Sequence, residues 1–310
     1  MILSYGVVQM IIVKNLDFRI DSFHLHVPHL EIRDDFSVLM GANGSGKTLL
    51  IYAILGLISL SEKTIIKVLG IDYSDPRVKK KISYLPQYSF MESWIKTRDQ
   101  IRFYSKLLSS SYGQTGIYDR IMELIDLLDV NKDELNKKFL ALSGGTRRKI
   151  EIAIALAVDA ELYILDEPLE NLDPEAREKV VSLLLTIKKN GKKIFVSSHY
   201  EEDSSVADDV IFMYSGKVIS RIKPSQIGRI VKNVTIVILS KMNKDAYDFF
   251  SKFNRYYLNA ERGECIIFEE SIDEVREKIN SSSIKNYVVG LYEKKPTIRD
   301  AYLYLVSSGV

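Results

Sequence analysis

Hydrophobic positions along the chain follow two spacings, and their order predicts an α/β domain. Short apolar runs of the kind that form buried strands alternate with longer segments whose apolar residues recur at helical spacing. The clearest strands are expected at residues 36–40, 82–87, 161–168 and 193–197. The clearest helices are expected at residues 49–55, 97–108, 118–128, 147–157 and 174–189. Alternation of this kind is typical of a sheet covered by helices.

Residues 10–20 and 23–32 are expected to form two further strands, and Pro28 inside the second marks an edge or a bend. Between residues 90 and 140 the chain changes to helical apolar spacing with charged faces, and residues 109–116 form a flexible connection. We interpret this stretch as a helical insert, about residues 88–150, in a larger α/β domain of residues 1–225.

The rest of the chain, residues 226–310, is predicted to be a separate small α+β domain. Its elements are expected in the order β-α-β-β-α-β, which suggests a ferredoxin-like fold. The strands are predicted at residues 233–239, 255–259, 264–269 and 286–293, and the helices at residues 245–253, 272–279 and 297–305.

Composition narrows the class of protein. The chain has 310 residues, of which 46% are hydrophobic and 27% charged, as in soluble globular proteins. Its net charge of +2 is too small to indicate nucleic acid or an anionic membrane as a partner. The single cysteine, Cys265, excludes an intrachain disulfide framework. No apolar run approaches the roughly 20 residues of a membrane span, and no positive residue precedes the apolar N-terminus, so we expect no secretion signal.

The most specific chemical signal is a glycine-rich loop between a predicted strand and a predicted helix. It matches the phosphate-binding pattern G-x-x-x-x-G-K-[S/T] with the residues Gly41, Ala42, Asn43, Gly44, Ser45, Gly46, Lys47 and Thr48. Backbone N–H groups in such a loop converge on phosphate oxygens, and the helix N-terminus adds its positive dipole end. Lys47 is placed to reach the β- and γ-phosphates, and Thr48 to offer its hydroxyl to Mg²⁺. The alternative is an ordinary glycine-rich turn.

Three further segments carry candidate chemistry. Asp166 and Glu167 end a buried strand, where an ATPase holds its metal and polarises water, although a solvated strand end would look similar. His199 also follows a predicted strand, on the side where ligands bind in α/β sheets, although a lone histidine is more often structural. Residues 143–146, serine and two glycines before threonine, open a helix and offer a second anion site.

Taken together, these segments resemble the nucleotide-binding subunit of an ATP-binding cassette (ABC) transporter, over roughly residues 10–223. The most specific mark is residues 142–146, which are similar to the family's signature motif. The order of phosphate loop, Gln87, signature, acidic pair, Asp173 and His199 adds to the resemblance. A phosphate loop alone is shared by many ATPases and GTPases.

The resemblance implies ATP and Mg²⁺ as ligands and assigns a role to each motif residue. Glu167 polarises the attacking water, His199 contacts the γ-phosphate, and Gln87 contacts both Mg²⁺ and the water. The metal is held by Thr48, Gln87 and, through water, Asp166. The nucleotide is held by Gly41, Asn43, Gly44, Ser45, Gly46, Lys47, Thr48 and Leu49 of one subunit and by Ser143, Gly144 and Gly145 of the other, with Asp173 communicating across the dimer.

The sequence departs from the family pattern at three positions. Thr146 stands where glutamine is commoner, and Leu49 stands where the family often has a second hydroxyl near the α-phosphate. The aromatic residue that stacks on adenine should fall near Ile20, so either Phe18 or Phe23 is expected to serve.

The function that the resemblance implies is that of a motor. ATP closes a dimer with a second ABC ATPase subunit, identical or related, and the motion drives separate transmembrane permease subunits, touching this chain at residues 88–102. Residues 297–302 are similar to the tails of export ATPases for drugs, antibiotics and lipid-linked cargo. The chain is then expected to be cytoplasmic and peripheral to the membrane, with no nucleic acid as partner. The alternative is a soluble ABC-type ATPase acting as a regulatory or nucleic-acid-associated motor.

Overall fold

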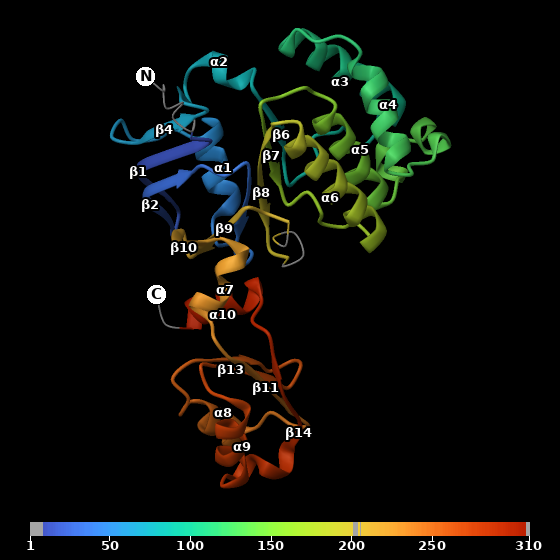
Figure 1. The fold of residues 1–310 in the computed structure, drawn as a ribbon. Helices are drawn as coiled ribbons and strands as arrows, with labels where there is room; N and C mark the ends of the chain where they lie inside the picture. The colour runs from blue at the N-terminus through green and yellow to red at the C-terminus, as the bar shows by residue number, and fades with distance from the viewer. Residues whose placement is uncertain (1–8, 201–203, 205, 308–310) are drawn as a thin grey trace. The chain divides into compact units, whose positions relative to one another are not determined.

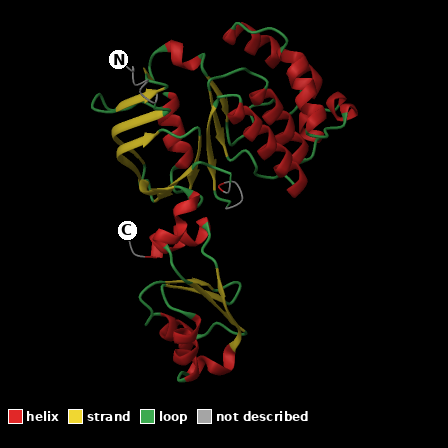
Figure 2. Cartoon of the chain, viewed as in Figure 1, coloured by secondary structure: helices red, strands yellow, loops and turns green. Residues whose placement is uncertain are grey.

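A computed structural model describes residues 9–200, 204 and 206–307. The chain divides into two compact units, Met1–Val218 and Ile219–Val310. Both units contain strands and helices (Figure 2).

A six-stranded sheet has the order β10-β9-β3-β8-β7-β6, and all of its strands except most of β10 belong to the first unit. Its strands are β3 (Phe36–Met40), β6 (Ile82–Leu85), β7 (Leu162–Asp166), β8 (Lys193–Ser198), β9 (Asp209–Tyr214) and β10 (Lys217–Ile222). The five strands from β9 to β6 pair in parallel. Every residue of β3 and β7 is buried, which explains why both are apolar except for Ser37 and Asp166. Parallel pairing places the ends of β3, β6, β7 and β8 at one edge of the sheet.

A second sheet, with the order β2-β1-β4-β5, is antiparallel. It consists of β1 (Ile11–Ile20), β2 (Phe23–Ile32), β4 (Ile65–Val68) and β5 (Ile71–Asp72). Helix α1 (Lys47–Leu55) lies between the two sheets (Figure 1). Its Leu50 and Ile54 share one buried core cluster with Leu25 of β2 and Leu39 of β3.

The other helices of this unit are α2 (Pro76–Lys79), α3 (Thr97–Tyr112), α4 (Ile117–Leu127), α5 (Gly144–Leu156) and α6 (Pro174–Lys189), with short 3₁₀ turns at Lys132–Asn136 and Phe139–Ala141. The predicted connection at residues 109–116 was wrong in its first half, because α3 continues to Tyr112. The Tyr112 hydroxyl donates a hydrogen bond to the carbonyl of Ile82, which fixes the last turn against β6. Gly113, with φ of 66°, then ends the helix.

The second unit has a four-stranded antiparallel sheet with the order β12-β13-β11-β14. Its strands are β11 (Val234–Leu239), β12 (Tyr256–Asn259), β13 (Glu264–Phe268) and β14 (Val288–Lys294). Its helices are α7 (Ile227–Ile230), α8 (Lys244–Phe250), α9 (Ile272–Asn280) and α10 (Ile298–Ser307), with 3₁₀ turns at Pro224–Gln226 and Ser283–Tyr287. From β11 to β14 the elements follow the predicted order β-α-β-β-α-β.

The core of this unit forms where α8 and α9 pack on the sheet. Phe250 of α8 and Val275 of α9 are fully buried there together with Cys265 of β13. Burial raises the pKa of the Cys265 thiol, so this cysteine is held in its protonated form.

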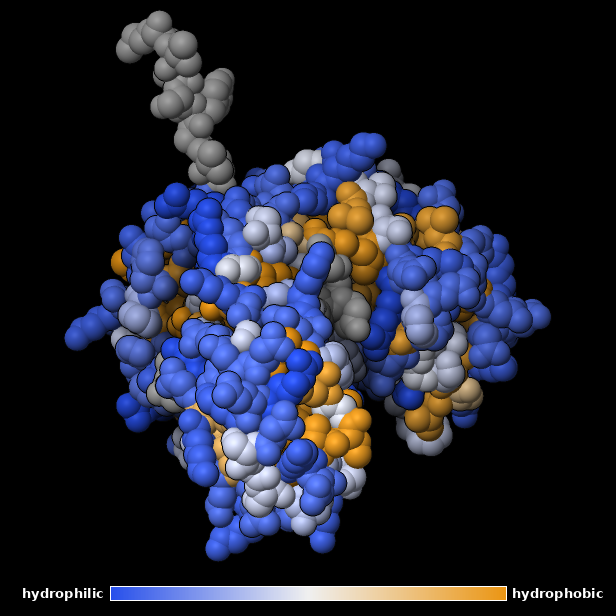
Figure 3. Space-filling model, turned by 60° about the horizontal axis from the view of Figure 1, so that its bottom comes forward, coloured by the Kyte–Doolittle hydropathy of each residue, from blue (hydrophilic) through white to orange (hydrophobic). Residues whose placement is uncertain are grey.

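No described helix combines the length and the apolar character that crossing a membrane requires. The face drawn in Figure 3 is mainly hydrophilic, and its hydrophobic residues gather in separate patches.

Candidate functional site

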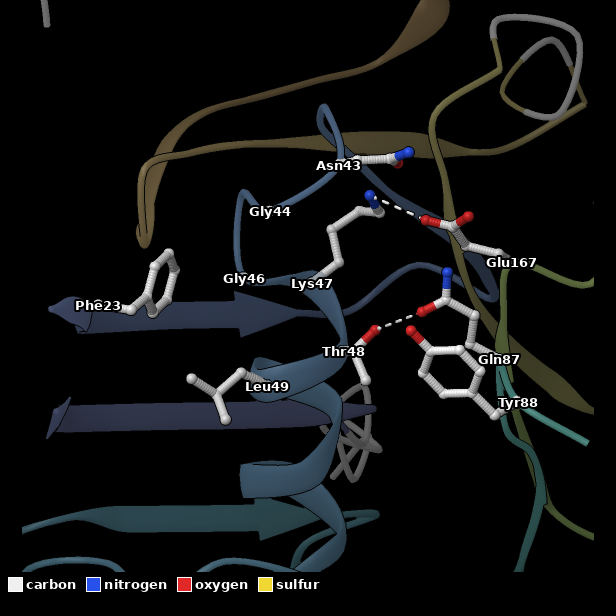
Figure 4. Close-up of a pocket in the computed structure, with 10 residues that line it drawn as sticks. All are labelled: Phe23, Asn43, Gly44, Gly46, Lys47, Thr48, Leu49, Gln87, Tyr88 and Glu167. Carbon is white, nitrogen blue, oxygen red and sulfur yellow. Dashed lines mark hydrogen bonds and ion pairs between the residues drawn. The ribbon is translucent and has the colours of Figure 1, made fainter. Parts of the chain in front are cut away.

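Most of the motif residues meet at the carboxyl edge of the parallel sheet. The phosphate-binding loop follows β3, Gln87 follows β6, Glu167 follows β7 and His199 follows β8. This edge is where α/β sheets bind their ligands. A cavity of about 410 Å³ opens here, lined by Phe23, Asn43, Gly44, Gly46, Lys47, Thr48, Leu49, Gln87, Tyr88 and Glu167 (Figure 4).

The conformation of the loop requires glycine at two positions. Gly46 has φ of 103°, and a Cβ there would lie 2.8 Å from the ring of Phe23. A Cβ on Gly41 would lie 2.4 Å from the carbonyl oxygen of Met213 on β9. The loop therefore lies close to its neighbours at Gly41 and Gly46, whereas Ala42, Asn43 and Gly44 are exposed.

Lys47 forms a buried ion pair across the cavity. Its Nζ lies 3.0 Å from Oε1 of Glu167, and the two side chains are only 4% and 5% exposed. The same Nζ donates a hydrogen bond of 2.9 Å to the carbonyl of Gly41. Figure 4 shows the Lys47 side chain extended toward Glu167. A buried cation at this point compensates negative charge, as phosphate binding requires.

Asp166 is fully buried, and its two carboxylate oxygens differ in their hydrogen bonding. Its Oδ1 accepts a hydrogen bond from the Ser197 hydroxyl, whereas Oδ2 has no hydrogen-bond partner among the described residues. Burial raises the pKa of Asp166, and the neighbouring Glu167 adds to the rise, while the hydroxyls of Ser197 and Thr48 oppose it. A buried carboxylate oxygen without a hydrogen-bond partner among the described residues, such as Oδ2, suits a bound cation.

The oxygens beside Asp166 also suit Mg²⁺. The Thr48 hydroxyl donates to Oε1 of Gln87 at 3.4 Å, so a hydroxyl and an amide oxygen face each other (Figure 4). The same Thr48 hydroxyl interacts with the carboxylate of Asp166. Mg²⁺ prefers such hard oxygen ligands and keeps part of its water shell. The donor set therefore fits the predicted metal site.

Glu167 is held in an uncommon backbone conformation. Its φ is 47°, and its N–H donates to the carbonyl of Ser197 at 3.2 Å. The carboxylate is thereby placed between Lys47 and His199, whose Nδ1 lies 3.1 Å from Oε2. A strained residue at a strand end is a feature of reaction sites. The arrangement allows Glu167 to accept a proton from a water molecule beside the cavity.

A further residue of the site, Arg148 of α5, was not predicted. Its buried guanidinium donates to the carbonyl oxygens of Asp166 at 2.8 Å and Glu167 at 2.9 Å. It also donates to the carbonyls of Pro86, just before Gln87, at 2.9 Å and of Pro168 at 3.2 Å. No signal in the sequence distinguishes Arg148, because it lies between Arg147 and Lys149 in a short basic run. Arg148 thus ties α5 to both the Gln87 and the Glu167 segments.

The predicted residues of the signature segment lie apart from this cavity. Ser143 caps α5 by accepting a hydrogen bond of 3.1 Å from the N–H of Thr146, and both Ser143 and Gly144 are exposed. Gly144 instead lines a smaller cavity of about 130 Å³, which Gln87 also lines. Asp173 caps α6 by accepting 2.9 Å from the N–H of Ala176. None of these residues lines the larger cavity.

The remaining predicted residues are placed as follows. Gly41 and Ser45 belong to the loop but do not line the cavity, and the Ser45 hydroxyl is buried without a hydrogen-bond partner among the described residues. Leu49 lines the cavity. The two candidate aromatics, Phe18 and Phe23, both pack against the core cluster, but only Phe23 also lines the cavity.

Comparison with known proteins places these features in a family context. The family profile described as "ABC transporter" matches residues 29–170. An energy-coupling factor transporter ATP-binding protein EcfA2 from Clostridium perfringens is 32% identical over 236 residues, covering 69% of this chain and 81% of the relative. The uncharacterized ABC transporter ATP-binding protein YxlF from Bacillus subtilis is 29% identical over 206 residues. The match spans 66% of this chain but less than two thirds, 64%, of YxlF.

Solved structures support the fold. The structure of an ATP-binding subunit of an ABC transporter superposes with a TM-score of 0.61 at 22% identity, covering 71% of this chain and 92% of that chain. At this identity the likeness concerns the fold alone.

Proposed function

The chain belongs to the ABC transporter family of ATP-binding proteins, and from this premise we propose that it hydrolyses ATP to drive a separate membrane-spanning permease. The observation that carries the proposal is the edge of the parallel sheet, where Lys47, Asp166 and Glu167 converge beside a glycine-rich loop. Phosphoryl transfer to water needs a cation, a metal-binding oxygen and a base. Lys47 provides the cation, Oδ2 of Asp166 the metal ligand, and Glu167 the base.

Each residue then has a distinct task. The loop N–H groups and Lys47 hold the phosphates, and Thr48, Gln87 and Asp166 hold Mg²⁺, which neutralises phosphate charge when bound. Glu167 orients the water and takes its proton, and His199 donates a hydrogen bond to the γ-phosphate. Phe23 is the side chain proposed to stack on adenine, since it borders the cavity.

The second half of the reaction site is proposed to come from another ABC ATPase subunit. Ser143 and Gly144 are exposed at the N-terminus of α5 and do not reach the cavity that Lys47 lines. Free N–H groups at a helix N-terminus suit a phosphate. We infer that they bind the γ-phosphate held by the opposite subunit, identical or related, so that ATP closes the dimer, with Asp173 at the contact.

The permease is proposed to touch the segment that follows Gln87. Large apolar side chains are exposed there, among them Tyr88 at 76% and Trp94 at 70%. Exposed apolar groups of this size mark an interaction surface. Gln87 lines both cavities, so a shift of this residue on hydrolysis would be passed to the surface beside it. We assign export as the direction, because residues 297–302 resemble the tails of export ATPases, and place the subunit on the cytoplasmic face of the membrane.

Replacing Glu167 by Gln tests the proposal. The amide keeps the shape and the contact with Lys47 but cannot accept the proton, so ATP is bound and not hydrolysed. We expect a nucleotide-bound dimer on size exclusion with ATP and Mg²⁺, and a rate of phosphate release at least about 100-fold below wild type.

The matched control is Glu175→Gln on α6, whose carboxylate is 79% exposed. This variant should hydrolyse ATP as wild type does. A Glu167→Gln protein that stays monomeric with ATP and Mg²⁺ would show that the dimer, or the role of Glu167, is assigned wrongly.

A further inference from the structure

Three potential metal ligands converge on the β1–β2 hairpin, outside the nucleotide cavity. Within the described residues, Asp17, His24 and His26 are the one group of three or more histidine, cysteine or acidic side chains whose ligand atoms all lie within 4.8 Å of one another. Oδ2 of Asp17 lies 3.1 Å from Nε2 of His24 and 3.0 Å from Nδ1 of His26.

The register of the hairpin explains why these donors meet. Asp17 of β1 is the direct cross-strand partner of His26. His24 lies two residues before His26 and therefore on the same face of β2. A direct pair and a diagonal neighbour on one face are within reach of each other. The opposite face carries Leu25 and Val27, which are fully buried. Packing of that face therefore holds all three polar side chains on the outside.

We propose that Asp17, His24 and His26 bind a divalent late transition-metal ion, namely Zn²⁺. Zinc takes imidazole nitrogen at about 2.0–2.1 Å and carboxylate oxygen at about 2.0–2.2 Å, which places neighbouring ligand atoms of a tetrahedral site about 3.4 Å apart. The two separations from Asp17 are a few tenths of an ångström shorter, and all three ligand atoms lie within 4.8 Å of one another, so modest side-chain rotations would bring them to coordinating positions.

The chemistry of the three ligands selects the class of metal. Two imidazoles and one carboxylate suit zinc and its neighbours, whereas Mg²⁺ and Ca²⁺ favour all-oxygen sites. The three side chains are 52%, 33% and 43% exposed, which leaves the fourth position open to water.

The competing description is a hydrogen-bonded contact between an aspartate and two histidines, without a metal. The metal site predicts one bound Zn²⁺ per chain and weaker Zn²⁺ binding when His24 or His26 is replaced. The metal-free contact predicts neither. His29 provides a matched control, because it lies on the same strand, is exposed, and has a carboxylate of Glu31 3.5 Å from its Nε2. A nonspecific surface histidine would bind zinc equally well at either place.

Zn²⁺ titration by calorimetry tests the site in the full chain, with Mg²⁺ in large excess to occupy the oxygen site at Asp166. Wild type and His29→Gln are expected to bind one Zn²⁺ per chain with the same affinity. His24→Gln and His26→Gln should each weaken that binding at least about tenfold. Co²⁺, used as a coloured substitute, should give visible absorption bands of a nitrogen-ligated ion in wild type and in His29→Gln, and lose them in the other two variants.

Thermal unfolding without metal checks that the variants remain folded, and all three should melt as wild type does because the replaced side chains are on the exposed face. Equal Zn²⁺ affinity in His24→Gln, His26→Gln and wild type would overturn the proposal. So would the absence of Zn²⁺ binding by the wild-type chain.

Discussion

The phosphate-binding loop and the signature segment are both glycine-rich turns that open a helix, yet their surroundings differ. The loop is closed in by its own chain, since Gly46 touches Phe23 and Lys47 is paired with Glu167. The signature segment is open at Gly144, where a Cβ would meet no atom within 4 Å, and narrower at Gly145, where a Cβ would lie 3.2 Å from the carbonyl oxygen of Asn171. A glycine in close contact with its own chain is required by the fold, whereas an open glycine leaves its helix N-terminus free for an outside ligand.

The contrast teaches where a glycine is required by the fold and where by a partner. At Gly46 the positive φ and the close ring exclude a side chain in the single chain. At Gly144 nothing in the single chain excludes one. A requirement for glycine at Gly144 must therefore come from a second molecule.

The largest expected effect is that of a substitution in the phosphate-binding loop. Lys47→Ala removes the cation that compensates phosphate charge and leaves Glu167 buried beside an uncharged residue. ATP hydrolysis should fall at least about 100-fold, measured as phosphate release under saturating Mg²⁺ and ATP. Lys63→Ala, at an exposed position, is the control and should be unchanged. Activity of Lys47→Ala within a few-fold of wild type would refute the site.

Arg148→Met tests whether α5, the helix that begins at the signature segment, also supports the segments beside the nucleotide cavity. The change leaves the carbonyls of Asp166 and Glu167 without their buried donor. We expect a loss of about 3 kcal/mol in the free energy of unfolding, which lowers the melting temperature by roughly 6–12 °C. The control is Arg147→Met, because Nε of Arg147 has no hydrogen-bond partner among the described residues. Equal melting temperatures for the two variants would disprove the coupling of α5 to the acidic strand.

The third prediction sets one glycine against the other. Gly144→Ala should keep the melting temperature and the ATP affinity of the monomer, but lower hydrolysis about tenfold, because the methyl group stands over N–H groups meant for the opposite phosphate. Gly46→Ala should lower the melting temperature as well as ATP affinity, since its Cβ would lie 2.8 Å from Phe23. Thermal melting and nucleotide binding on both variants decide this. Full hydrolysis by Gly144→Ala would remove the need for a second subunit.

The smallest effect is expected at Asp166. Burial raises the pKa of this carboxyl, so its ionised form costs folding free energy, and that cost grows as the pH rises above the unfolded-state pKa and is complete above the folded-state pKa. Asp166→Asn removes the charge and keeps the hydrogen bond from Ser197. In buffer without Mg²⁺ the variant should gain about 1 kcal/mol, a rise of roughly 2–4 °C in melting temperature, while losing stabilisation by Mg²⁺ and ATP. A lower melting temperature for Asp166→Asn would show that the charge is fully compensated.

Local pattern was enough to predict the elements that meet at the cavity. The loop between β3 and α1, the acidic end of β7 and His199 after β8 each depend on a short stretch of sequence with its own spacing. The parallel order of the strands then brings them to one edge without further information. The same holds for the β-α-β-β-α-β order of the second unit.

Contacts between distant residues could not be predicted in this way. Arg148 reaches carbonyls 18 and 62 positions away, at Asp166 and Pro86, and a single helix sequence carries no sign of them. The meeting of Asp17 with His24 and His26 depends on hairpin register, which one misplaced turn residue would change. The end of α3 was misjudged for the same reason, because the bond from Tyr112 to Ile82 spans 30 positions.

The buried cysteine of the second unit has a practical consequence. Cys265 is the only thiol of the chain, it is inaccessible, and its raised pKa keeps it unreactive. A cysteine introduced at an exposed position outside the nucleotide-binding segments, such as Ser110→Cys on α3, can therefore be labelled with a fluorophore or spin label without first removing the native one. Distances between labels on two subunits could then be followed through a full cycle of nucleotide binding and release in the otherwise unaltered protein.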